Sequence, residues 1–142
     1  MSESTLGQIK SFVIRTSRMS PAQKRGWERY GEQFIVPFTG DTIVSPATFF
    51  PDRDPHRLLK LDIGFGMGRE LATLAEHEPE TDFIGVEVHR PGVGRLLLDL
   101  GERNLNNVRI VSHDVVDVCR FMLPAASIDA VHLFFPDPWP KA

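Results

Sequence analysis

The 142-residue sequence is 42% hydrophobic and 25% charged and contains one cysteine, a composition typical of a single globular domain. One cysteine excludes an internal disulfide, and no apolar run approaches the roughly 20 residues that a transmembrane helix needs. Residues 1–8 are polar and lack the apolar stretch of a signal peptide. We therefore expect a cytoplasmic protein that has no membrane partner.

The formal net charge of −3 conceals a basic N-terminal segment. Residues 1–30 contain six lysines and arginines and two glutamates, whereas the remaining residues contain 10 basic and 17 acidic side chains. A basic arm on an acidic body suits contact with a polyanion such as a nucleic acid. A solvated tail would have the same composition, so charge alone leaves both interpretations open.

A helix is predicted to begin after Ser20 and to run to about Tyr30. Ser20 can cap it, a proline follows at the first helical position, and Gln23 can complete a capping box. Trp27 and Tyr30 lie three residues apart on one face of this helix. That spacing favours packing against the body of the protein over stacking on a nucleic-acid base.

From residue 56 onward, short apolar runs alternate with segments of helical periodicity. The predicted strands are Leu58–Ile63, Asp82–Val88, Val108–Ser112 and Ala130–Phe135, and the predicted helices are Met67–His77, Pro91–Arg103 and Val115–Leu123. Strands joined by helices imply an α/β fold with a doubly wound, mostly parallel sheet and helices on both faces. We expect residues 1–55 to form a basic arm with leading helices and residues 56–142 to form the ligand-binding domain. Cys119, in the last of these helices, is predicted to be buried.

The sequence LDIGFGMG, at Leu61–Gly68, joins the first strand to its helix through three glycines, Gly64, Gly66 and Gly68. A strand, a glycine turn and a helix in this order let backbone approach a ligand closely. The free N–H groups at the start of the helix also point toward that ligand. We therefore predict that the three glycines line a cofactor site.

Acidic residues stand at or just past the ends of all four predicted strands: Asp62, Glu87, Asp114 and Asp137. Ligands of doubly wound sheets bind at these carboxyl ends. Glu87 lies 19 residues after Gly68, a spacing that suits hydrogen bonds from a ribose diol. Asp114 is placed to meet an adenine edge, and Asp62 lies beside the glycine turn, where it would attract a positively charged group.

These carboxylates favour S-adenosylmethionine over NAD as the cofactor. A dinucleotide fingerprint has a third glycine where this chain has Arg69, and an acidic pocket suits a pyrophosphate poorly. S-adenosylmethionine has a ribose, an adenine, an ammonium and a sulfonium and no phosphate, so acidic side chains attract it. The five histidines have no metal-ligand spacing, and we predict no metal site.

Four blocks of the sequence together resemble the bacterial tRNA (guanine-N7)-methyltransferase family: LDIGFGMGRELATLA, FIGVEVHRPGVG, NVRIVSHDVVDV and HLFFPDPWPK. The resemblance implies a Rossmann-like class I methyltransferase that methylates guanine N7 at position 46, in the variable loop of tRNA. It further implies that Asp62, Glu87, Asp114 and Asp137 contact S-adenosylmethionine or the methyl-transfer site. Asp137 would be the catalytic residue and Lys141 a substrate contact. The family commonly has glutamate where this chain has Asp62.

Members of that family continue beyond the FFPDPWPK motif with further strands and substrate residues. We therefore expect the sheet of this chain to lack the last strands and its fourth strand to be an exposed edge. Such an edge favours self-association, and we expect the 142 residues alone not to methylate tRNA. The alternative is a non-catalytic fragment that binds the cofactor or a protein partner.

Overall fold

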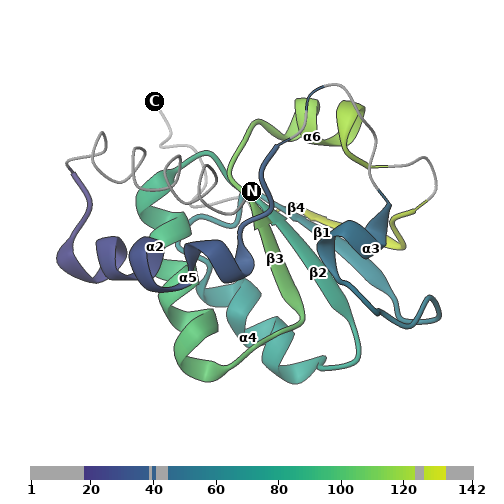
Figure 1. Cartoon of the computed structure of the whole chain (residues 1–142), viewed down its shortest axis with the longest axis horizontal. Coiled ribbons are helices and arrows are strands. Elements are labelled where there is room, and N and C mark those ends of the chain that lie inside the picture. The colour runs from purple at the N-terminus through teal and green to yellow at the C-terminus, as the bar shows by residue number, and fades with distance from the viewer. Residues whose placement is uncertain (1–17, 39, 41–44, 124–126, 134–142) are drawn as a thin grey trace, which may run out of the picture.

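The computed structural model describes residues 18–38, 40, 45–123 and 127–133. Its helices are α2 (Pro21–Phe34), α3 (Pro46–Phe49), α4 (Arg69–His77), α5 (Arg90–Arg103) and α6 (Val115–Phe121). Its strands are β1 (Leu59–Ile63), β2 (Asp82–Val86), β3 (Val108–Val111) and β4 (Ala130–Leu133). Within this part of the chain the strands form one four-stranded sheet in the order β3-β2-β1-β4, and every pairing is parallel (Figure 1). The predicted parallel α/β fold is confirmed.

The predicted elements shift by a few residues at their ends. Helix α4 begins at Arg69 and not at Met67, because Gly68 precedes it in the left-handed conformation. Helix α2 continues past Tyr30 to Phe34, because Gly31 and Phe34 extend its buried face. The last two residues of the predicted fourth strand, 134 and 135, lie outside the described residues.

Helices cover both faces of the sheet, as predicted. On one face, Phe83, Val108 and Ile110 pack in a core shared with α2, α4 and α5. On the other face, Leu59, Leu61 and Val111 pack with α3 and α6. Since successive side chains of a strand alternate between the faces, the two cores lie on opposite sides of the same strands.

Helix α2 lies along α5, and its N-terminus has the predicted capping box. The Ser20 hydroxyl accepts from the N–H of Gln23 at 3.2 Å, and the Gln23 side chain accepts from the N–H of Ser20 at 2.8 Å. Trp27 is 2% exposed and packs in the core, so its predicted packing role is confirmed.

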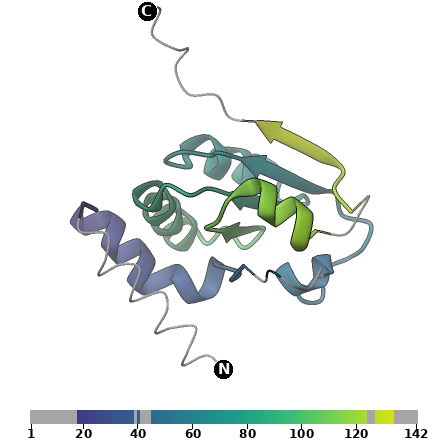
Figure 2. The same cartoon turned by 90° about the horizontal axis from the view of Figure 1, so that it is seen from above.

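One strand edge is covered and the other is open within the described residues. Beyond α2, Val36 donates its N–H to the carbonyl of Ile110 at 2.8 Å, which covers part of the outer edge of β3. Strand β4 has β1 as its neighbour on one side and has no described neighbour on the other. Figure 2 shows β4 at the margin of the molecule away from α2. Val131 and Leu133 of this strand are more than half exposed.

The prediction that Cys119 is buried was wrong, because its side chain is exposed on α6. The residues of α6 and its C-terminus that face the sheet are Val118 and Met122, which are fully buried. A spacing of four residues places Val118 and Met122 on one helical face, and Cys119 lies about a quarter turn away from Val118. No described helix is long and apolar enough to cross a membrane.

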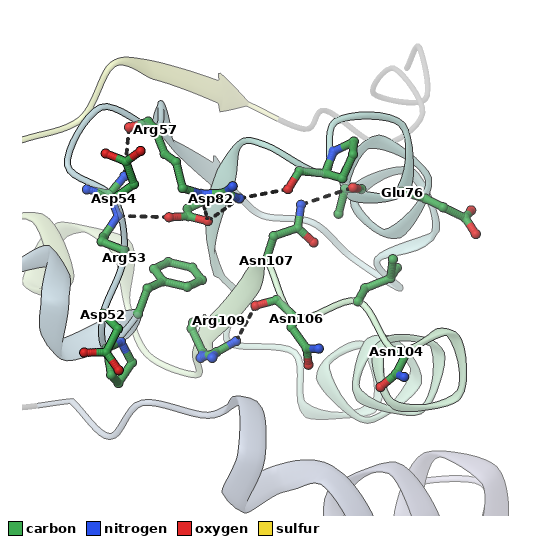
Figure 3. A pocket seen from close by; sticks show the side chains of 15 residues that line it. Asp52, Arg53, Asp54, Arg57, Glu76, Asp82, Asn104, Asn106, Asn107 and Arg109 are labelled. Carbon is green, nitrogen blue, oxygen red and sulfur yellow. Dashed lines mark hydrogen bonds and ion pairs between the residues drawn. The ribbon is translucent and has the colours of Figure 1, made fainter.

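An ion-pair cluster fixes the amino edge of the sheet (Figure 3). Asp82, at the start of β2, is 3% exposed, and its carboxylate accepts from Arg53 Nε at 2.9 Å. Its other oxygen lies 2.8 Å from a guanidinium nitrogen of Arg57. These groups line a cavity of about 560 Å³ that also includes Asn107 and Arg109. The cluster ties the segment before β1 to β2, at the edge opposite to the glycine turn.

Candidate functional site

The loop between β1 and α4 is a turn that requires glycine. Gly64, Gly66 and Gly68 have φ angles of 68°, 64° and 80°, which residues with a side chain rarely adopt. The N–H of Gly64 donates to the carbonyl of Val86 at 2.8 Å, so the turn begins directly at the carboxyl ends of β1 and β2. Gly68 ends the turn as the N-cap of α4.

Glu87 follows β2 and holds this turn through its carboxylate. One oxygen accepts from the N–H of Gly66 at 2.7 Å. The other accepts from the N–H groups of Val88 at 3.1 Å and His89 at 3.0 Å. A carboxylate has about four acceptor positions, so these three bonds leave about one for a ligand hydroxyl. Glu87 therefore orders the turn itself, a role that the sequence did not predict.

Asp62 is a buried carboxylate at the end of β1, with a relative exposure of 8%. Among the described residues no hydrogen-bond donor contacts it. Burial, and secondarily the charge of Glu70, raises its pKa from 3.8 to about 6. Asp62, Glu70 and His132 line a cavity of about 130 Å³ between α4 and the neighbouring strands β1 and β4. A buried carboxylate without a partner, beside a second carboxylate, suits a cationic ligand group.

Asp114 is exposed and forms the N-cap of α6, where its side chain accepts from the N–H of Val116 at 2.8 Å. The preceding residue, His113, stacks on Phe38 with ring centroids 3.8 Å apart and planes within 5° of parallel. Its Nε2 lies 3.1 Å from a carboxylate oxygen of Asp117. The segment after α2 thus places the Phe38 ring at the carboxyl end of β3. No local feature of the sequence indicates this contact.

The parallel sheet brings Asp62, Glu87 and Asp114 to the same edge. Asp62 is the penultimate residue of β1, and Glu87 and Asp114 follow β2 and β3. These adjacent strands lie about 4.8 Å apart from neighbour to neighbour. Asp137 and Lys141 lie outside the described residues, so their predicted roles remain predictions. The described residues include no cluster of three or more His, Cys, Asp or Glu side chains that could hold a metal ion.

Three apolar side chains at this edge were not predicted. Met67, Val88 and Val116 come from the loops after β1 and β2 and from the start of α6, and they are 46%, 60% and 63% exposed. Exposed apolar side chains at the edge that also has the glycine turn and the carboxylates suit a ligand with an apolar part as well as polar groups.

Comparison with known sequences gives one family for this chain. Residues 56–142 match the family model described as "Putative methyltransferase". The curated tRNA (guanine-N(7)-)-methyltransferase of Burkholderia cenocepacia is 48% identical over 135 residues, which cover 95% of this chain and 51% of that protein. The enzyme of the same name from Methylobacillus flagellatus is 47% identical over 133 residues, which cover 94% of this chain and 55% of that protein.

This chain thus spans about half the length of the curated relatives that it matches. The matched region of the family model includes the glycine turn, Glu87 and Asp114, which form the carboxyl edge described above. On the extent of this match, the chain belongs to that methyltransferase family.

Proposed function

We propose that this chain binds S-adenosylmethionine and forms the cofactor-binding part of an enzyme that methylates guanine N7 in tRNA, with position 46 as the expected site. The observation that carries the proposal is the buried Asp62 carboxylate beside the glycine turn. The relatives are tRNA (guanine-N(7)-)-methyltransferases, and the substrate, tRNA, and the reacting position, guanine N7, are taken from them.

The described residues fit this cofactor better than they fit a dinucleotide. Asp62 has no hydrogen-bond donor within the described part of the chain and can accept from an ammonium group. Glu87 has about one acceptor position left for a ribose hydroxyl, and Asp114 keeps the oxygen that does not cap α6. A pyrophosphate at the same edge would meet three carboxylates, which repel it.

When bound, S-adenosylmethionine supplies an electrophilic methyl group. Guanine N7 has a free lone pair and needs no base to remove a proton, so the protein has to align the two reactants. In this proposal Gly64, Gly66 and Gly68 give the backbone its close approach to the cofactor. Asp137 accepts from the N–H groups of the guanine and stabilises the positive charge that grows on the base, and Lys141 contacts the tRNA.

Basic side chains would hold the tRNA through its phosphates. Arg18, Arg25 and Arg29 are exposed at and beside α2, and the sequence before residue 18 adds Lys10 and Arg15. Contacts of this kind fix the position of a nucleic acid without reading its sequence. Their affinity should therefore fall steeply as the salt concentration rises.

Calorimetry on the 142-residue chain tests the cofactor. We expect S-adenosylmethionine to bind and NAD not to bind at the same concentrations. Binding of NAD without S-adenosylmethionine would overturn the assignment. For variants that remove a carboxylate of the site, the matched control is Glu102→Gln, which removes an exposed carboxylate of α5 and should bind S-adenosylmethionine like the wild type.

A chimaera tests the methyl transfer. Residues 1–142 replace the matching half of the Burkholderia cenocepacia relative, and incorporation of a labelled methyl group into tRNA is measured. We expect activity in the chimaera and loss of turnover with little loss of cofactor affinity in its Asp137→Ala variant. A chimaera that binds cofactor and never methylates tRNA would favour the alternative of a non-catalytic cofactor-binding module.

We also propose that the 142 residues alone self-associate along β4. The support is the edge of β4, which has no neighbour among the described residues, and the half-exposed Val131 and Leu133 of that strand. Unpaired N–H and C=O groups on a strand edge favour pairing with another chain. A chain paired in this way would lack the arrangement that tRNA methylation needs.

A further inference from the structure

Helices α2 and α5 approach each other at backbone distance. A Cβ atom on Gly26 of α2 would overlap the carbonyl oxygen of Gly94 in α5, and it would lie 3.1 Å from the N of Leu98. A Cβ atom on Gly94 would in turn overlap the carbonyl oxygen of Gln23. Two glycines at one crossing allow this contact, which larger side chains would prevent.

Trp27 fixes α2 against the first turn of α5. Its side chain is 2% exposed, and its Nε1 donates to the carbonyl oxygen of Arg90 at 3.0 Å. Arg90 is the first residue of α5. A buried indole N–H needs such an acceptor, so this bond sets where α2 lies along α5.

The same first turn of α5 contacts the glycine turn of the cofactor site on its other side. A Cβ atom on Gly92 would overlap the carbonyl oxygen of Gly66. The N–H of Gly66 donates to Glu87 at 2.7 Å, and Glu87 also accepts from the N–H of His89, the N-cap of α5. Gly66 is therefore packed at its carbonyl against the start of α5 and bonded at its N–H to Glu87, which also accepts from the N-cap residue of α5.

We propose that α2 is a positioning element of the cofactor site and that Trp27 is its positioning residue. The hydrogen bond of Trp27 sets the position of residues 90–94. Gly92, which packs against the Gly66 carbonyl, then sets the position of the glycine turn that faces the cofactor. The inference rests on the proposed cofactor site and adds to it a residue from the N-terminal segment, outside the region matched by the family model.

Trp27→Phe tests this role, because it removes the indole N–H and keeps an aromatic ring in the core. The control is Tyr30→Leu, since Tyr30 packs against Gly101 near the other end of the α2–α5 contact, far from the glycine turn. For each variant we would measure urea unfolding, the Kd of S-adenosylhomocysteine by calorimetry, and hydrogen exchange of the Gly66 amide. Binding would be measured where all variants remain folded.

We expect Trp27→Phe to raise the Kd by about three- to tenfold, the factor that the loss of one buried hydrogen bond carries. Exchange of the Gly66 amide should accelerate by a similar factor. Tyr30→Leu should lower the unfolding midpoint and leave both quantities within about twofold of wild type. Equal effects of the two variants on Kd and on Gly66 exchange, or no effect of Trp27→Phe on either, would overturn the inference.

A measurement on the wild-type chain covers the case in which Trp27→Phe does not fold. Coupling is reciprocal, so S-adenosylhomocysteine should slow exchange of the Trp27 indole N–H. Protection of Gly66 alone would overturn the coupling to α2. A wild-type chain that binds neither S-adenosylhomocysteine nor S-adenosylmethionine would refute the proposed function, whereas Gly66 exchange in the variants would still decide the role of Trp27.

Discussion

Replacing Asp62 with asparagine should stabilise the chain near neutral pH and weaken its binding of cofactor. In the folded chain the Asp62 pKa is about 6, because the carboxylate is buried and lies near Glu70. In the unfolded chain it returns to 3.8. Between these two values the folded state keeps a proton that the unfolded state has lost, so stability falls as the pH rises toward 6.

The size of this effect follows from the two pKa values. A rise from 3.8 to about 6 corresponds to a loss of about 3 kcal/mol of stability once the pH exceeds the folded value. Asparagine has no charge to bury, so the substitution removes this loss of stability. Burial of its amide also costs free energy, so only part of the roughly 3 kcal/mol is regained. We therefore expect Asp62→Asn to be more stable than wild type by roughly 1–3 kcal/mol at pH 7.5.

Urea unfolding between pH 4 and pH 8 measures this effect directly. The difference between Asp62→Asn and wild type should be small near pH 4 and should grow until just above pH 6. Glu102→Gln is the control, because it removes an exposed carboxylate and should change stability little at any pH. A difference between Asp62→Asn and wild type that stays constant over the whole range would refute the reasoning.

The same substitution should act in the opposite direction on the cofactor. A charged carboxylate bonded to an ammonium group contributes about 1.5–3 kcal/mol, so Asp62→Asn should weaken binding by at least about tenfold. In the wild type, affinity should fall as the pH drops below about 6, where Asp62 takes up a proton. Unchanged affinity in the variant would show that Asp62 does not receive the ammonium.

Three further changes separate the roles of other residues. Asp82→Asn should destabilise the chain by about 3 kcal/mol, because it leaves Arg53 and Arg57 without their buried counter-charge, and cofactor affinity measured on folded protein should not change. Glu87→Gln should lower the free energy of unfolding without ligand by roughly 1–3 kcal/mol and should also lower cofactor affinity, since an amide cannot accept all three backbone bonds. Melting curves and calorimetry measure the two effects, and a loss of affinity alone would contradict the structural role of Glu87. Leu133→Lys should reduce self-association in light scattering, and an unchanged particle mass would argue against pairing along β4.

The sheet could be predicted from the sequence because its signals are local. Each strand is a short apolar run, and the glycine turn and acidic residues mark where strands end. All four strands begin within one residue of the predicted position. Helix ends were less predictable, since Gly68 and Phe34 set them through backbone conformation and packing against other elements.

Contacts between distant segments left no such signal. Phe38 and His113 are 75 residues apart, and nothing near either one indicates that their rings stack. Asp82 could be read only as the first residue of a strand, whereas its two arginine partners lie 25 and 29 residues earlier. The exposed position of Cys119 depends on which face of a seven-residue helix meets the sheet, and its mixed apolar sequence did not fix that face.

Glu87 shows why a correct site residue can still be incompletely understood from sequence. Its spacing from the glycines predicts a ribose contact, and that prediction considers the ligand alone. In the structure three backbone N–H groups already occupy the carboxylate, so its charge orders Gly66 and the start of α5 before any ligand binds. The charge near Gly66 is therefore needed for the turn as well as for the cofactor. Asp62 is the opposite case, because burial of its carboxylate lowers the stability of the ligand-free chain near neutral pH. The same buried charge suits a cationic group of the ligand. Glu87 stabilises the folded site without ligand, whereas Asp62 destabilises it until a cation binds. Substitution of Glu87 should therefore destabilise the free chain, and substitution of Asp62 should stabilise it.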